Sequence, residues 1–109
     1  MSLTMNDFQT KCINQCKVLF AQYPFLGESN FEPIQGSKES YFKAEFSIQD
    51  RRLLEVFIYE DEAGFMVGGK EWTICEKPDY SSPDHLISGF IEKINKKLSE
   101  HNPRSLDTQ

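Results

Sequence analysis

The chain contains three cysteines, and two of them, Cys12 and Cys16, are close enough in sequence to act together. A separation of four residues suits a pair of zinc ligands, but a structural zinc site needs four ligands. The other candidates are Cys75, His85 and His101, and the two histidines lack a ligand-like spacing. A redox pair would normally be Cys-x-x-Cys. We therefore predict that Cys12 and Cys16 are buried core residues, and we predict no metal ion or other cofactor.

Two further patterns suggest chemistry but lack residues that it requires. Gly68, Gly69 and Lys70 superficially resemble a phosphate-binding loop, which needs Gly-x-x-x-x-Gly-Lys-Ser/Thr between a strand and a helix. Here Glu71 follows the lysine and a predicted strand comes next, so we expect no nucleotide site. The acidic run at positions 60–62 lacks the alternating oxygen ligands of a calcium loop, and we interpret it as a solvated turn.

Glu45 and Glu55 fall in neighbouring predicted strands, and paired carboxylates can serve as a general acid and a general base. Strand alternation places both on the exposed side of the sheet, where carboxylates are more often plain surface residues. With only two histidines in the chain, no Ser/His/Asp or Cys/His grouping can be specified. We predict no catalytic residues, and an enzymatic activity is the less favoured interpretation.

Length and composition indicate one ordinary globular domain. The chain has 109 residues, of which 39% are hydrophobic and 27% are charged. Its formal net charge of −5 disfavours nucleic acid as a partner, because the phosphate backbone is also negative. No apolar run approaches the roughly 20 residues that span a bilayer, so we expect no membrane association. The odd, small number of cysteines and the lack of a signal peptide predict a soluble protein in the cytoplasm.

The first predicted element is an amphipathic helix near the beginning of the chain. Asn6 can cap this helix together with Gln9, which follows three residues later. Apolar residues then recur at spacings of three and four. The helix should stop near Tyr23, because the following Pro24 disfavours a helical conformation at the residue before it.

A second helix is predicted towards the end of the chain. Ser82 is a good N-cap, Pro83 suits the first helical position, and Asp84 is favoured in the first turn. The helix should end at Asn102 and Pro103. We expect residues 1–4 to be a vector-derived or disordered leader, residues 5–101 to form a single domain and residues 102–109 to be a disordered tail.

Between the helices the sequence predicts three or four antiparallel strands. Residues 41–48 alternate cleanly between apolar and polar side chains, and residues 52–60 follow after a sequence suited to a hairpin turn. Gly68 and Gly69 then separate two shorter strand-like runs, either as a tight hairpin or as a bulge within one strand. The whole chain is therefore predicted to be an α+β fold, a two-layer antiparallel meander with both flanking helices on one face of the sheet.

Two segments of this meander carry less regular patterns. Alternation in residues 71–76 places Cys75 with Thr73 on the polar face of its strand and leaves Trp72 and Ile74 on the other face. Residues Gly27–Ser40 are rich in Gly, Ser, Asn and Pro, and we predict a long loop that Phe31 and Ile34 pin to the domain, either as irregular chain or as a short extended segment.

The strand at 52–60 is apolar on both faces, which is unusual for an antiparallel strand with one solvated side. One face holds Leu54, Val56 and Ile58. The other face, together with a neighbouring tyrosine, forms our candidate interface, which consists of Tyr41, Leu53, Phe57 and Tyr59. Either another protein chain or the loop at 27–40 could cover this surface.

We therefore favour a non-enzymatic protein–protein interaction module, with a protein partner or a second copy of the chain bound to the outer face of the sheet. A homodimer formed through that face is one version of this hypothesis. The alternative is a small-ligand-binding domain or an enzyme with a pocket between the sheet and the helices. Tyr59, Trp72 and His85 are the residues that we would first expect to line such a pocket.

Overall fold

The computed structural model describes residues 5–24, 26, 30–36, 39–48, 53–69 and 71–100. The predicted leader, the turn at 49–51, Lys70, His101 and the predicted tail lie outside the described residues. The elements, in chain order, are α1 (Asp7–Phe20), β1 (Glu32–Gln35), β2 (Ser40–Ser47), β3 (Leu53–Ile58), β4 (Ala63–Val67), β5 (Glu71–Cys75), a single 3-10 turn η1 (Lys77–Asp79) and α2 (Pro83–Glu100).

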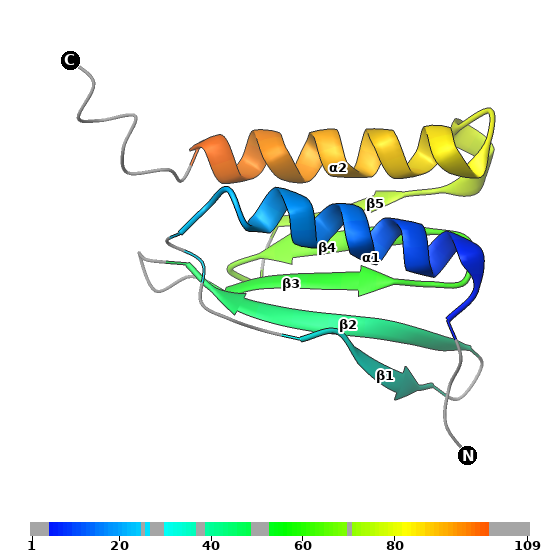
Figure 1. Cartoon of the computed structure of the whole chain (residues 1–109), viewed down its shortest axis with the longest axis horizontal. Helices are drawn as coiled ribbons and strands as arrows, with labels where there is room; N and C mark the ends of the chain where they lie inside the picture. Colours follow the sequence, from blue (N-terminus) through cyan, green and yellow to red (C-terminus); the bar gives the residue numbers. More distant parts are fainter. Residues whose placement is uncertain are drawn as a thin grey trace.

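The five strands form one antiparallel meander in the order β1-β2-β3-β4-β5, and the two helices lie side by side on one face of it (Figure 1). This is the predicted α+β architecture. The helices run parallel to each other. Near their starts the Lys11 ammonium lies 3.4 Å from the Asp84 carboxylate, and towards their ends the Tyr23 hydroxyl donates a hydrogen bond to Asn95 Oδ1 at 2.5 Å.

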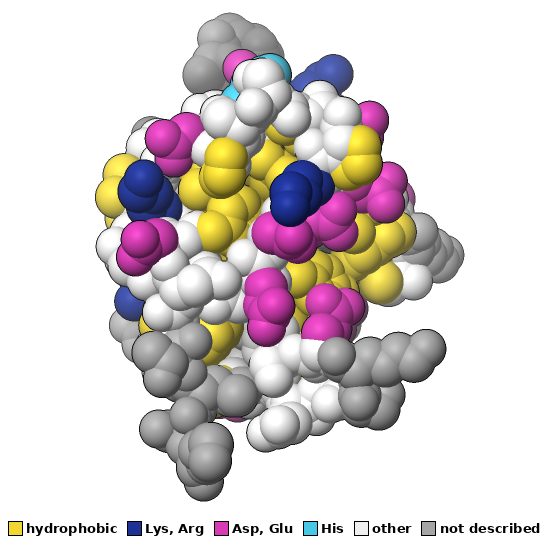
Figure 2. Space-filling model, turned by 90° about the vertical axis from the view of Figure 1, so that its right-hand side faces the viewer, with side chains coloured by type: hydrophobic (Ala, Val, Ile, Leu, Met, Phe, Trp, Pro, Cys, Tyr) yellow, Lys and Arg dark blue, Asp and Glu magenta, His cyan; other side chains and the backbone are white. Residues whose placement is uncertain are grey.

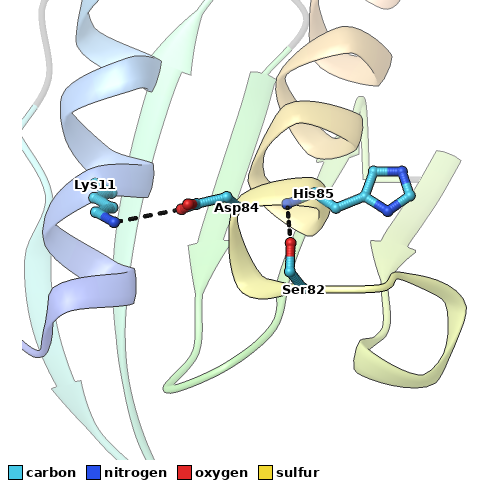
Figure 3. Close-up of polar contacts among 4 residues, drawn as sticks. All are labelled: Lys11, Ser82, Asp84 and His85. Atoms are coloured by element: carbon cyan, nitrogen blue, oxygen red, sulfur yellow. Dashed lines mark hydrogen bonds and ion pairs between the residues drawn. The ribbon is translucent and has the colours of Figure 1, made fainter.

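Both helices begin as their sequences predict. The Gln9 backbone N–H donates to Asn6 Oδ1 at 2.7 Å, and the Asn6 N–H donates to Gln9 Oε1 at 3.0 Å, which completes a capping box. At the second helix the His85 N–H donates to Ser82 Oγ at 3.1 Å (Figure 3). The Lys11–Asp84 contact between the helices lies in the same turn. The first helix is also tied to the sheet, because Asn6 Nδ2 donates to the carbonyl of Glu60 at 2.9 Å.

The core lies between the helices and the inner face of the sheet. The predicted alternation in β2 and β3 is confirmed, because the inward side chains are all buried there against helix residues such as Phe20 and Phe90. The rings of Phe20 and Phe46 meet edge to face at 4.7 Å, and those of Phe65 and Phe90 at 6.0 Å. The inward residues of the two strands are Phe42, Ala44, Phe46, Leu54, Val56 and Ile58.

The sheet has one strand more than the maximum of four that the sequence predicted. Residues Glu32–Gln35, which fall in the predicted loop, pair with β2 as an edge strand. Pro33 has no backbone N–H to donate. It is tolerated there because one side of an edge strand has no partner strand that would need this donor. Gly68 and Gly69, with φ of 64° and 71°, turn the chain between β4 and β5, so the hairpin interpretation holds and the single bulged strand does not.

We predict that Asn6→Ala lowers the free energy of unfolding by about 1–2 kcal/mol, because it removes the cap of α1 and the link to the β3–β4 turn. Urea denaturation followed by circular dichroism measures this loss. Asn14→Ala is the matched control: Asn14 is exposed in the middle of the same helix, so this change should be neutral or slightly stabilising. Equal effects of the two substitutions would contradict the capping role.

Candidate functional site: the outer face of the sheet

The face of the sheet that the helices leave uncovered is built by cross-strand pairs. Lys43 on β2 is opposite Phe57 on β3, Phe57 is opposite Gly64 on β4, and Gly64 is opposite Ile74 on β5. In the neighbouring row Glu45 is opposite Glu55. Because successive residues of a strand alternate between faces, all of these side chains lie on the side of the sheet away from the helices.

Four aromatic side chains of this face contact one another, and we call Tyr41, Phe57, Tyr59 and Trp72 the aromatic cluster. Ring centroids are 5.2 Å apart for Tyr41 and Tyr59, 6.1 Å for Tyr41 and Phe57, and 5.4 Å for Phe57 and Trp72. These separations fall in the range of favourable aromatic pairs. The cluster therefore forms one continuous row of rings across β2, β3 and β5.

The structure brings together three of the four residues of the predicted interface. Tyr41, Phe57 and Tyr59 belong to the aromatic cluster, whereas Leu53 lies opposite Ser47 at the far end of β3 and is 38% exposed. Trp72, which we predicted to line the alternative pocket, is the fourth member of the cluster.

Trp72 reaches Phe57 because Gly64 has no side chain. A Cβ placed on Gly64 would lie 2.8 Å from Trp72 Cη2 and 3.0 Å from the carbonyl oxygen of Thr73. The indole therefore occupies the space beside Gly64 and meets the Phe57 ring edge to face. A glycine between two strand residues marks such a close approach, and this is the signal from which the contact could have been predicted.

The assignment of the two faces of β5 needs a correction. Cys75 and Thr73 do share a face, as predicted, but that face points at the helices, and Cys75 is buried. The neighbouring Glu71 forms an ion pair with Lys97 of α2 at 2.7 Å. The inward side of β5 thus carries one buried thiol and an ion pair to α2, and the apolar side, with Trp72, faces outwards.

Charged groups border the aromatic cluster on β2 and β3. Lys43 Nζ lies 3.1 Å from Glu45 Oε2, 3.4 Å from Glu55 Oε2 and 5.4 Å from the centroid of the Phe57 ring. The hydrogen bond to Glu45, and then that to Glu55, raise the pKa of Lys43, although partial burial acts against them. Lys43 thereby offsets the repulsion between two carboxylates placed directly opposite each other.

The tyrosines of the cluster lie near a further carboxylate, that of Glu39. Burial raises the pKa of Tyr59 above its ordinary value of 10.0, and the nearby Tyr41 and Glu39 raise it further. Next to the cluster, a hollow of about 290 Å³ is lined by Asn30, Glu32, Ile34, Lys43 and Glu45. This hollow runs along the pair of strands β1 and β2.

The described part of the segment 27–40 does not lie across the aromatic cluster. Its residues 32–35 extend the sheet edge, and Phe31 packs against Phe46 on the inner, helix-covered side. Trp72 keeps 43% of its surface exposed. Figure 2 views the end of the molecule where both helices begin, and there hydrophobic side chains reach the surface among several acidic ones.

The three cysteines are all buried, and Cys12 and Cys16 lie in the core as predicted. The hydrogen bond with Cys12 and burial raise the pKa of Cys16 well above 9.0, and burial raises that of Cys75. These groups are therefore thiols at neutral pH. Within the described ranges, no three His, Cys, Asp or Glu side chains are grouped so that they could hold a metal ion.

His85 is placed away from the other two residues of the predicted pocket. It is exposed in the first turn of α2, where its ring lies 5.2 Å from that of Tyr80. Its Nδ1 accepts a hydrogen bond from the Ser81 backbone N–H at 3.1 Å. Tyr59 and Trp72 are on the opposite face of the sheet, and the structure does not bring the three side chains together.

Comparisons with models of known protein families, with characterised proteins and with solved structures find no significant match to this chain. None of the helices in the described part of the chain is both long enough and apolar enough to cross a membrane.

We predict that the native protein reacts slowly with Ellman's reagent, because all three thiols are buried and the pKa values of Cys16 and Cys75 are raised. All three thiols should react at once in concentrated guanidinium chloride. Above about pH 9.0, the unfolded chain loses thiol protons that the native chain keeps, so the free energy of unfolding should fall as the pH rises. A thiol that reacts rapidly in the native protein would contradict this account.

Gly64→Ala should displace the Trp72 indole and lower the free energy of unfolding by about 1–3 kcal/mol, because the new methyl group overlaps the ring. Trp72 is the only tryptophan, so its emission should shift to longer wavelength as it becomes more exposed. Gly89→Ala is the control, since a Cβ there would lie 2.6 Å from Tyr80 Cε1 in the helix layer. It should destabilise the protein without shifting the emission.

Proposed function

We propose that this protein is a protein–protein interaction module that binds a partner polypeptide through the outer face of its sheet. The observation that carries the proposal is the aromatic cluster, four rings in continuous contact on the face that the helices do not cover. Aromatic residues are enriched in interfaces and supply much of their binding energy, because they bury a large area at a low entropic cost.

The composition of this face supports an interface over ordinary surface. An antiparallel sheet with one solvated side normally alternates apolar inward residues with polar outward ones. β3 departs from this pattern at Phe57 and Leu53, and β5 departs from it at Trp72 and Ile74. Five strands about 4.8 Å apart give a sheet roughly 20 Å wide. Such a face can hold the centre of an interface of standard size, about 800 Å² per partner.

A second copy of the chain is one candidate partner, and the two copies would then form a homodimer through the outer face. A pocket formed by Tyr59, Trp72 and His85 has no comparable support, because these side chains lie on two different layers of the molecule. The proposal therefore concerns binding by a surface, without a catalytic step.

Photo-crosslinking tests this proposal at single positions. The chain with Phe57→p-benzoylphenylalanine should give a specific crosslinked product when it is irradiated in cells that express it. The matched control is the same replacement at Val18, which is 67% exposed on α1 in the helix layer and should give no such product. A product of twice the chain mass identifies a homodimer, and any other mass identifies a different partner.

Similar crosslinking from both positions, or from neither, would contradict binding through the outer face. Light scattering after size-exclusion chromatography shows separately whether the purified chain self-associates. Phe57→Asp should abolish any self-association through this face and Val18→Asp should not, because only the first places a charge among the clustered rings.

A further inference from the structure

We infer that the partner that binds the aromatic cluster is a cationic segment of another protein, with arginine and large apolar side chains, and not a second copy of this chain. This inference rests on the proposed function and adds the chemistry of the partner. It follows from the charged groups that surround the cluster and from the type of side chain that fits both carboxylates and aromatic rings.

Carboxylates surround the cluster on the β1–β2 side. Glu32 is paired across the strands with Lys43, Glu55 is 3.4 Å from Lys43, and Glu39 is close enough to raise the pKa of Tyr59. Among the described residues of the outer face, Lys43 is the only cation, and it is shared between Glu45 and Glu55. The described part of this surface therefore carries more negative than positive charge.

Arginine matches both components of this surface. Its planar guanidinium binds a carboxylate through two parallel hydrogen bonds and also stacks on an aromatic ring. The hollow of about 290 Å³ beside the cluster is lined by two carboxylates, an amide, an aliphatic side chain and one ammonium, which belong to Glu32, Glu45, Asn30, Ile34 and Lys43. The Lys43 ammonium is already paired with Glu45 and Glu55. That volume is at the low end of ligand pockets, which fits one long side chain better than a whole small molecule.

The remaining part of the surface is apolar. Phe57 and Trp72 meet at 5.4 Å, and Ile74 lies opposite Gly64 beside them. A segment that places its cations over Glu32 and Glu39 can therefore place large apolar side chains over these rings. The Lys43 ammonium already lies over the Phe57 ring, which shows that a cation can occupy this aromatic surface.

A second copy of the chain fits this surface less well. Each chain carries a net charge of −5, so a second copy brings the same excess of negative charge to the interface. Like charges brought together across an interface are unfavourable, and they slow association most at low salt. A partner of opposite charge is instead attracted by the glutamates of the outer face.

Three blocked synthetic heptapeptides serve as probes: alternating Arg and Leu, alternating Glu and Leu, and alternating Arg and Ser. Trp72 is the only tryptophan and belongs to the cluster, so its fluorescence reports binding directly. The Arg/Leu peptide should shift the emission with the highest affinity, and the Glu/Leu peptide should not bind. The Arg/Ser peptide should bind more weakly because it lacks apolar side chains.

Variants of the full chain separate a specific site from general attraction to an acidic protein. Glu32→Lys should weaken binding of the Arg/Leu peptide by roughly five-fold, the size expected for exposed ion pairs. Glu92→Lys makes the same change of charge at an exposed position of α2 and should have little effect. Phe57→Ser should remove the emission shift while the circular dichroism spectrum confirms that the sheet is intact.

The outcomes distinguish this inference from the proposed function. Equal binding of the Arg/Leu and Glu/Leu peptides, or equal weakening by Glu32→Lys and Glu92→Lys, would overturn the cationic partner and leave the outer face as an interface. A dimer that depends on Phe57 would also overturn the cationic partner, because a second copy would then occupy the surface. If no peptide binds and Phe57 yields no crosslink, the proposed function fails as well.

Discussion

The packing of two parallel helices against one face of the sheet is the contact on which the other features depend. The inward side chains of β2, β3 and β4, such as Phe46, Val56 and Phe65, are buried beneath α1 and α2. The two helices cover one face of the five-stranded sheet, and both of them pack against its inner side. The hydrophobic residues on the outer side must therefore be covered by something else or remain at the surface.

Much of this arrangement could be predicted from local sequence. The caps at Asn6 and Ser82 and the alternation in β2 and β3 depend on neighbouring residues, so their patterns are complete in short windows. β1 was not predicted as a strand because its four residues, Glu-Pro-Ile-Gln, include a proline and only one strongly apolar side chain. It forms because β2 offers an edge to pair with, and a local pattern does not contain that information.

The candidate surface was predicted only in part, for a similar reason. Period-two alternation grouped the side chains of β3 correctly and placed Phe57 and Tyr59 together. It could not show which face of β5 points outwards, because that depends on how the strand pairs with β4 and packs against α2, which is distant in sequence. Trp72 belongs to the cluster because the β4–β5 register places it diagonally opposite Gly64, and that register was not known from the sequence. The position of Lys43 between Glu45 and Glu55 likewise depends on the register of β2 and β3.

The parallel course of the first and last helices also constrains how this chain reaches its native state on the ribosome. Two of the polar contacts between these segments, Lys11–Asp84 and Tyr23–Asn95, link residues 73 and 72 positions apart. α1 is synthesised first, yet its apolar stripe has no complete surface to dock on until α2 has left the exit tunnel. Final closure of the core therefore waits for α2, and until then Cys12, Cys16 and Phe20 lack the helix that completes their burial.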